Sequence, residues 1–323
     1  MENRKALRIA FFSVAAVLAL AATLIFRPFS SGAELVEVAI PPGTSAAQVS
    51  QILVGKDIID SPALFKALAR VTGASRKLYP GIYTLSKETG SWKALRILSR
   101  GHAAEYKVTF PEGWTAQQIA QTLELNRILK AKDFLDEVYR LNLEGYLYPN
   151  TYYFRPFSSA QEVVARMLSE FNKRWTKEDE ITAYKLGLTR HKVVILASIV
   201  EREAKVDAER PMVAAVFLNR LKKGWRLESC ATVQYALGVP KDRLLYKDLE
   251  VDSPYNTYRN KGLTPGPIGN PGWPSIEAVL HPATTDALFF VAEGTGTHRF
   301  TKYLKAHQQE KRALRRVQRK VRP

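Results

Sequence analysis

One segment of the chain occurs twice, and this repeat limits the possible folds more than any other feature. Residues 38–53 read VAIPPGTSAAQVSQIL, and residues 108–123 read VTFPEGWTAQQIAQTL. In each copy, alternating apolar residues predict a short strand, and the Pro and Gly predict a turn. Ser45 and Thr115 then stand at the cap position of an amphipathic helix. Because two copies are too few for a solenoid, we expect two βα units in neighbouring layers or two duplicated small modules.

The residues between the two copies complete a compact module. Ser61–Gly73 predicts a helix with Pro62 in its first turn and a glycine at its end. Leu78–Ser86 reads as a turn followed by a strand, and Ser91–Gly101 reads as a second helix that stops at glycine. We therefore predict a mixed α and β module over residues 36–105. It holds no catalytic constellation, so we interpret it as a binding or spacing module.

From Tyr106 onward the pattern is mostly helical, with long loops. Apolar periodicity predicts helices at residues 115–125, 131–141, 159–173, 177–186, 190–203 and 208–223. Tyr255–Trp273 is rich in Pro, Gly and Asn and predicts a long loop that forms a shaped binding surface. Ala287–Ala292 and His298–Thr301 predict a closing hairpin. The predicted fold class is α+β, with the larger domain at residues 106–310.

Residues 9–26 form an apolar run that no charge interrupts. As a helix this run would span ~27 Å, close to the hydrocarbon thickness of a bilayer. Basic residues at positions 4, 5 and 8 favour a cytoplasmic tail at residues 1–8, with the rest of the chain outside. A cleaved signal peptide is the alternative, since Ala19 to Ala22 offers small residues at positions 19, 21 and 22. We expect an uncleaved single-pass anchor because the apolar run continues to residue 26.

The formal net charge of +17 is concentrated toward the C-terminus. From residue 302 onward there are nine basic residues and one acidic residue, a balance of +8. Residues 311–323 are interpreted as a basic tail, either simply solvated or bound to an anionic partner. We predict no nucleic-acid partner, because no nucleic-acid-binding module is recognisable. The single cysteine, Cys230, excludes a disulfide within the chain.

The stretch ASIVEREA, residues 197–204, points to chemistry because two glutamates end an apolar run. Helical residues two apart point away from each other, so Glu201 and Glu203 cannot face one cavity. On a helical wheel Glu203 continues the stripe of Leu196 and Ile199, whereas Glu201 falls opposite. An acid at the end of a buried stripe loses hydration, which favours the neutral form that a general acid needs. The competing interpretation is a frayed last turn, with Glu203 ion-paired and Glu201 in water.

Polar and aromatic residues elsewhere in this region are typical of a groove for a sugar polymer. Aromatic rings pack on the apolar faces of sugars, and amide side chains bond their hydroxyls. The candidate substrate-binding residues are Glu144, Tyr146, Tyr152, Asn219, Gln234, Tyr235, Tyr255 and Asn256. For each of these residues taken singly, the alternative is a structural role in the core or at a helix cap. Since the chain lacks a G-x-S-x-G elbow, a phosphate loop and metal-ligand spacing, we expect no cofactor and no metal ion.

Several segments resemble, in their order, the endolytic murein transglycosylases of the YceG-like family. ASIVEREA is followed by ERPMVAAVFLNRL, ATVQYALG, YNTY, GLTPGPIGNPG, HPA and FVAEGTGTHRF, and LEGYLYPNTY resembles the family's upstream motif. The resemblance runs from the apolar run to about His307. It implies one inner-membrane helix at residues 9–26, a LysM-like module and a periplasmic catalytic domain.

The resemblance also implies cleavage of the β-1,4 bond between N-acetylmuramic acid and N-acetylglucosamine, with a 1,6-anhydromuramyl end as product. In the family motif the second glutamate is catalytic, which here is Glu203. It would protonate the glycosidic oxygen and then take the proton of the muramyl C6 hydroxyl. A hydrolytic muramidase with a second carboxylate, and a non-catalytic peptidoglycan-binding scaffold, remain alternatives. The implied partners are peptidoglycan strands, with peptidoglycan synthases and division proteins as candidates.

The sequence departs from the family pattern at three places. Ala204 follows Glu203 where relatives often carry Thr or Ser, and Cys230 stands where an acid is common. The segment AHQQ at residues 306–309 lacks a His-Asn ending. At these positions the contacts that support the family's catalytic residue are therefore not carried over to this chain.

Overall fold

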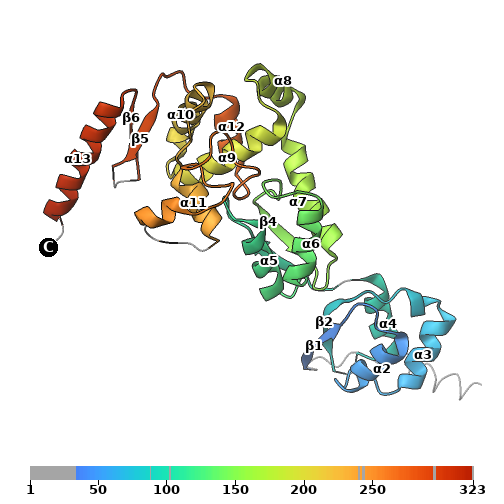
Figure 1. Cartoon of the computed structure of the whole chain (residues 1–323). Coiled ribbons are helices and arrows are strands. Elements are labelled where there is room, and N and C mark those ends of the chain that lie inside the picture. Colours follow the sequence, from blue (N-terminus) through green and yellow to red (C-terminus); the bar gives the residue numbers. More distant parts are fainter. Residues whose placement is uncertain are drawn as a thin grey trace, which may run out of the picture. The chain divides into compact units, whose positions relative to one another are not determined.

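The computed structural model describes residues 34–321 except positions 88, 102, 239, 240, 242, 243, 294 and 295. The chain forms two compact units (Figure 1). The first contains the described residues up to Val108 together with residues 126–129 and 152–158, and the second contains the remainder. The predicted anchor at residues 9–26 lies outside the described residues. Of the helices that the structure does describe, none is long and apolar enough to cross a membrane.

The first unit combines a two-stranded antiparallel sheet with short helices. β1 (Leu35–Ile40) pairs with β2 (Gly81–Ser86), with Leu35 opposite Ser86 and Ile40 opposite Gly81. The helical elements are α2 (Ala46–Val54), α3 (Pro62–Val71), η1 (Ala74–Arg76) and α4 (Ser91–Arg100). Alternate residues of β1, among them Val38 and Ile40, pack with the apolar faces of the helices in one core. The strands and helices predicted between residues 36 and 105 are confirmed.

The remaining elements are mostly helical, and the mixed α+β class is confirmed. The helices are α5 (Ala116–Leu125), α6 (Ala131–Arg140), α7 (Ala160–Arg174), α8 (Lys177–Lys185), α9 (Arg190–Glu203), α10 (Arg210–Lys222), α11 (Cys230–Leu237), α12 (Trp273–Leu280) and α13 (Leu304–Val321), with short 3-10 turns η2 (Asp207–Glu209) and η3 (Tyr246–Glu250). Small two-stranded sheets join β3 (Tyr106–Thr109) to β4 (Thr151–Phe154), and β5 (Phe289–Ala292) to β6 (His298–Thr301). The predicted helices from residue 115 to 223 and the closing hairpin are therefore present.

Both copies of the repeat fold as the sequence predicts, each as a strand, a turn and a capped helix. In the first copy Ser45 and Gln48 cap α2 reciprocally, each side chain accepting from the other residue's backbone N–H at 3.3 and 2.9 Å. Thr115 and Gln118 do the same at α5, at 3.3 and 2.9 Å. This capping box satisfies two helix-start N–H groups in each copy.

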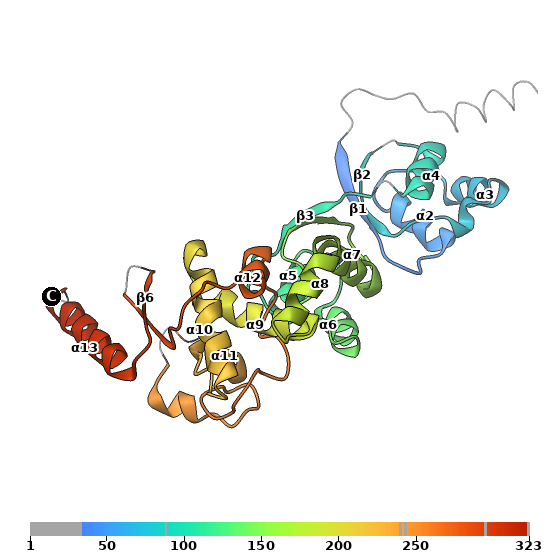
Figure 2. The same cartoon turned by 90° about the horizontal axis from the view of Figure 1, so that it is seen from above.

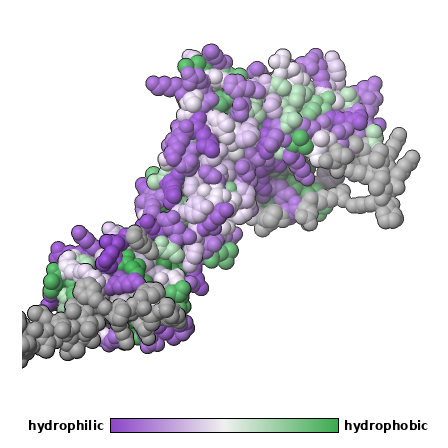
Figure 3. All heavy atoms as spheres, turned by 180° about the vertical axis from the view of Figure 1, so that it is seen from behind, coloured by the Kyte–Doolittle hydropathy of each residue, from purple (hydrophilic) through white to green (hydrophobic). Residues whose placement is uncertain are grey.

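Helix α9 lies at the centre of the second unit's core. Every residue from Val193 to Val200 is buried. α10, α11 and α12 pack around α9, as Figures 1 and 2 both show. The face of the molecule in Figure 3 mixes polar and apolar residues over both units. Because neighbouring helices enclose α9, they also fix the positions of Glu201 and Glu203 at its C-terminal end.

Candidate active site

Glu203, the last residue of α9, lines a cavity of about 270 Å³. The cavity is lined by residues from α10, from the start of α11 and the segment before it, from the loop that contains Tyr258, from the β5–β6 hairpin and from α13. Its lining residues are Glu203, Arg220, Leu227, Glu228, Cys230, Tyr258, Phe290, Val291, Ala292, His298 and His307. The predicted catalytic glutamate is thus partly buried in a space that other ionisable groups share.

Two donors hold one oxygen of the Glu203 carboxyl group. The Ser229 hydroxyl donates to Glu203 Oε1 at 2.5 Å, and the backbone N–H of Ala231 donates to the same oxygen at 3.2 Å. The second donor belongs to the first turn of α11, where backbone N–H groups have no helical partner. Oε1 is therefore occupied, and the proton that a general acid must donate belongs on Oε2.

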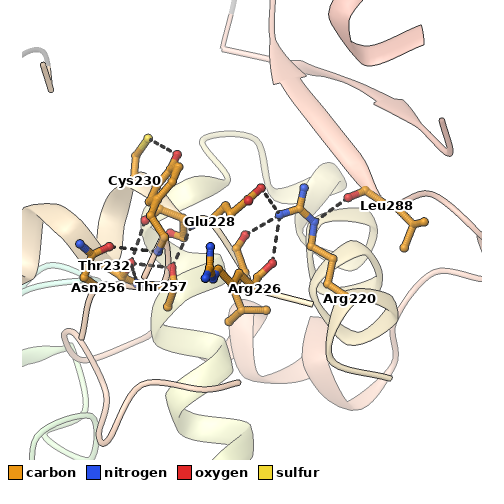
Figure 4. A network of polar contacts seen from close by, with 11 residues as sticks. Arg220, Arg226, Glu228, Cys230, Thr232, Asn256, Thr257 and Leu288 are labelled. Atoms are coloured by element: carbon orange, nitrogen blue, oxygen red, sulfur yellow. Dashed lines mark hydrogen bonds and ion pairs between the residues drawn. The ribbon is translucent and has the colours of Figure 1, made fainter. Parts of the chain in front are cut away.

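The turn that carries these donors is braced by the loop at residues 255–258, part of which Figure 4 shows. Asn256 is fully buried and donates to backbone carbonyls at positions 249 and 251, at 2.9 and 2.8 Å. Thr257 Oγ1 then accepts from Ser229 N at 3.0 Å and lies 2.8 Å from Thr232 Oγ1. Asn256, predicted to bind substrate, therefore acts through Thr257 and Ser229 to fix the surroundings of Glu203.

Arg220 and Glu228 form a second charged group in the cavity (Figure 4). The Arg220 guanidinium donates to Glu228 Oε2 at 3.1 Å, to Leu227 O at 2.9 Å and to Leu288 O at 2.7 Å. Glu228 has a φ of 51°, in the left-handed region that non-glycine residues rarely adopt. Such strain at a cavity wall is typical of positions that the surrounding structure fixes for function.

His298 brings an imidazole to the same cavity from the start of β6. Its Nδ1 lies 2.8 Å from Glu209 Oε2, and its backbone N–H donates to Glu209 Oε1 at 2.9 Å. The His298 side chain is 8% exposed and that of Glu209 is 16% exposed. The Glu209 carboxylate thus holds His298 by one bond to its imidazole and one to its backbone.

Glu201 has a structural role on the opposite side of α9. Its side chain is 7% exposed and pairs with Arg210 at 2.9 Å. Its Oε2 accepts from Gly272 N and Ser275 Oγ, both at 2.9 Å. The wheel separated the two glutamates correctly, but the interpretation that Glu201 lies in water is wrong. α10 and the start of α12 cover that side, which no helical wheel can indicate.

Glu144 joins three segments of the second unit that are distant in sequence. Its carboxylate accepts from Ala116 N at 3.1 Å and from Asn270 Nδ2 at 3.0 Å. Asn270 Oδ1 in turn accepts from Gly145 N and Leu147 N, both at 2.9 Å. Burial raises the pKa of Glu144 to about 7, although these donors oppose the shift. Glu144 therefore titrates near neutral pH inside a structural junction.

The pH dependence of stability is expected to report Glu144. Its pKa is raised from 4.5 to about 7 by folding, so the folded state holds a proton that the unfolded state has lost between those values. The stability gained from neutral Glu144 is complete below about pH 4.5 and is lost as the pH rises through about 7. In thermal melts, Glu144→Gln should lose less stability than the wild type between those pH values. Parallel pH curves for the two proteins would contradict this assignment.

Two predicted aromatic residues lie together near Glu144. The rings of Tyr235 and Tyr255 have centroids 4.9 Å apart. Burial and the charge of Glu144 raise the pKa of both hydroxyl groups, so Glu144 lies within electrostatic reach of them. Arg202, which precedes Glu203, interacts electrostatically with Glu203, Tyr235 and Glu144. An aromatic and charged tract thus extends from Glu203 to Glu144.

Tyr146 and Tyr152 do not line the Glu203 cavity. The Tyr146 hydroxyl lies 3.0 Å from His191 Nδ1, and its ring lines a separate cavity of about 330 Å³ beside Arg190. Tyr152 is 3% exposed and stacks on Phe154 with centroids 5.5 Å apart. Their predicted contact with substrate has no counterpart at the Glu203 cavity.

Asn219 and Gln234 make backbone contacts inside the second unit. Asn219 Nδ2 donates to the carbonyls of Thr285 and Ala287, at 2.9 and 3.1 Å. Gln234 bonds both the N–H and the carbonyl of Lys241. Asn219 therefore secures the segment that leads into β5, and Gln234 closes the loop after α11.

Sequence reasoning did not nominate the cavity residues Glu228, Tyr258 and His298 as site residues. Each stands in or beside a motif segment, but no periodicity links them to Glu203, because they meet only through tertiary folding. The one signal available in the sequence was that several short motif segments occur together in a fixed order; no single motif pointed to these residues. Over the ranges that the structure describes, no three His, Cys, Asp or Glu side chains are grouped to hold a metal ion.

Comparisons with known proteins agree on one family. The profile of the YceG-like family matches residues 38–313. An endolytic murein transglycosylase of Bacillus subtilis is 37% identical over 304 residues, which are 85% of this chain and 84% of the relative. Another, from Streptococcus pneumoniae, is 29% identical over 302 residues, which are 80% of this chain and 54% of the relative. A crystal structure of a yceG-like protein from Listeria monocytogenes is 34% identical, with a TM-score of 0.58 over 85% of this chain and 98% of that chain.

Proposed function

This chain belongs to the YceG-like family, and on that premise we propose that it is an endolytic lytic transglycosylase of peptidoglycan. The proposed reaction breaks the β-1,4 bond between N-acetylmuramic acid and N-acetylglucosamine inside nascent glycan strands. The muramyl C6 hydroxyl replaces the leaving sugar at the anomeric carbon, and a 1,6-anhydromuramyl end forms without water. Because that end has no free anomeric hydroxyl, elongation of the strand stops there.

The position of Glu203 carries this proposal. It lies in a cavity, and two donors fix its Oε1, so Oε2 is the oxygen available to carry a proton. Protonated Oε2 would donate to the glycosidic oxygen as the bond to the anomeric carbon breaks. One carboxyl group can then accept the proton of the C6 hydroxyl in turn, as expected for this family.

The tract between Glu203 and Glu144 supports a glycan substrate. Tyr235 and Tyr255 are partly buried aromatic rings of the kind on which sugar rings pack, and Arg202 interacts electrostatically with both carboxyl groups. We propose that consecutive sugars of the strand follow this tract. In this proposal Glu144 shapes the groove through its bonds to Ala116 and Asn270 and transfers no proton.

We also propose that the chain is anchored in the inner membrane by residues 9–26, with its catalytic part in the periplasm. The support is the uninterrupted apolar run with basic residues before it. Peptidoglycan strands are the proposed partner of the periplasmic part, and synthases of the same polymer are candidate neighbours.

The products decide between a transglycosylase and a hydrolase. The full chain should release fragments that end in 1,6-anhydromuramic acid, which have one water less in mass than hydrolytic fragments. Mass spectrometry of the digested glycan measures both kinds of end. A digest with only reducing ends would contradict the proposed reaction.

A hydrolytic muramidase is the second candidate, and one observation favours it. Glu228 is a second carboxylate in the cavity of Glu203, as a hydrolase that activates water requires. However, Glu228 Oε2 accepts from the Arg220 guanidinium at 3.1 Å, so this carboxylate oxygen is already engaged by a structural partner. Reducing ends that disappear in Glu228→Gln would support this candidate.

A further inference from the structure

The Glu209–His298 pair fixes which imidazole nitrogen of His298 carries a proton. A carboxylate only accepts hydrogen bonds, so Nδ1 at 2.8 Å from Glu209 Oε2 must be the protonated nitrogen. Phe290 and Phe300 pack on the ring, with centroids at 5.3 and 6.3 Å. The ring is thereby held, and neutral His298 keeps a lone pair on Nε2. Because His298 also lines the Glu203 cavity, that lone pair belongs to a group beside the proposed acid.

Three other polar residues of the cavity are engaged in ways that do not suit a proton acceptor, and the second imidazole of the cavity, His307, stacks on Phe289 with ring centroids 5.2 Å apart. Glu228 is paired with Arg220. The Tyr258 hydroxyl lies 3.2 Å from Cys230 Sγ, and burial raises its pKa above the normal range, so it stays protonated. Glu203 presents one oxygen only, because Ser229 and Ala231 occupy Oε1.

The proposed reaction moves protons at two different substrate atoms. The glycosidic oxygen gains a proton, and the oxygen of the muramyl C6 hydroxyl loses one. If Glu203 alone serves both, a single carboxyl oxygen must reach both atoms in turn. If a second group with a free lone pair accepts the proton of the C6 hydroxyl, Glu203 needs to reach only the glycosidic oxygen. A carboxylate beside that second group stabilises the positive charge that it gains with the proton.

We infer that His298 is a further catalytic residue, which accepts the proton of the attacking C6 hydroxyl while Glu203 donates to the leaving oxygen. The bond from the anomeric carbon to the glycosidic oxygen breaks, its electron pair stays on that oxygen, and the Glu203 proton joins it. The C6 oxygen bonds to the anomeric carbon, and its proton passes to Nε2. Glu209 faces the resulting imidazolium, and proton exchange through water restores both residues. This inference rests on the transglycosylase activity proposed above.

Two variants of the full chain remove the acceptor and keep the surrounding contacts. In His298→Asn the side-chain amide can still donate to Glu209, but no atom replaces Nε2. In Glu209→Gln the amide donates to Nδ1, so the proton moves to Nε2 and the lone pair turns away from the cavity. The matched control is His281→Asn, an exposed histidine of the same unit. Thermal melts verify that each variant is folded.

A substrate that needs no acid separates the two roles. The probes are intact glycan strands and the 4-nitrophenyl glycoside of the disaccharide GlcNAc–MurNAc, whose phenolate leaves without a proton. On strands, Glu203→Gln, His298→Asn and Glu209→Gln should each lose about 10²-fold or more in kcat/KM. On the aryl glycoside, the kcat/KM of Glu203→Gln should lie within about tenfold of the wild-type value. His298→Asn and Glu209→Gln should remain about 10²-fold or more below the wild type on this substrate as well. The His281→Asn control should match the wild type on both.

Two results would overturn the inference. Folded His298→Asn and Glu209→Gln proteins with wild-type rates would show that the imidazole takes no part. Recovery of both variants on the aryl glycoside, together with Glu203→Gln, would assign His298 to the acid step instead. Failure of the proposed function is seen separately, as reducing ends from the wild type. A loss that persists on the aryl glycoside would then identify His298 as the acceptor for attacking water.

Discussion

Replacing Glu203 by glutamine should lower the rate of glycan cleavage by about 10³-fold or more while the protein remains folded. Glutamine keeps an oxygen that can accept from Ser229 and Ala231, so the local structure has no reason to change. It has no proton to donate to a glycosidic oxygen of low basicity, so bond cleavage loses its acid. Release of soluble muropeptides from purified peptidoglycan measures the rate.

The control for this experiment is Glu277→Gln, an exposed glutamate of α12, which should leave the rate unchanged. Equal activity of Glu203→Gln and the wild type would rule out Glu203 as the acid. A chain that binds strands but cleaves none, with or without the substitution, would favour the non-catalytic scaffold. Loss of cleavage with an unchanged melting temperature would support the enzyme.

Replacing Glu201 by alanine should lower the free energy of unfolding of the second unit by about 3–5 kcal/mol. Arg210 is 12% exposed on its side chain and would lose its buried partner, keeping only the exposed carboxylate of Asp207 at 2.9 Å. Gly272 N and Ser275 Oγ would lose their acceptor as well. A loss of this size is a large share of the stability of a typical domain.

Urea denaturation followed by tryptophan fluorescence suits this test, because four of the five tryptophans belong to the second unit. The matched control is Asp136→Ala, which breaks the exposed pair with Lys132 on α6. That change should cost less than about 1 kcal/mol. Equal effects of the two substitutions would mean that the burial of Glu201 contributes nothing.

The parts of the fold that sequence could predict are those with local causes. Caps such as Ser45 and Thr115 and the apolar stripe of α9 each depend on neighbours within one or two turns. Glu203 was identified in the same way, as the residue that continues a stripe. The short helices α11 and α12 escaped prediction because they lie in a region of turns and prolines, where periodicity over two turns is weak.

The parts that could not be predicted depend on contacts between distant segments. Glu209 and His298 lie 89 positions apart, and Asn270 reaches 126 positions to Glu144. Neither pair has a spacing that a helix or strand imposes, so no local pattern marks it. For the same reason the sequence predicts substrate contacts for Tyr152 and Asn219, although the fold uses them for packing and for backbone contacts.

The two copies of the repeat have the same local structure but different surroundings. The turn glycines have nearly equal φ values, 75° at Gly43 and 76° at Gly113. A methyl group at Gly43 would meet nothing within 4 Å, whereas at Gly113 it would meet Glu201 Cγ at 3.4 Å. Gly113 also donates its N–H to Asn270 O at 2.7 Å. Among related chains, insertions and sequence drift should therefore collect in the first turn, while the second turn stays fixed in length.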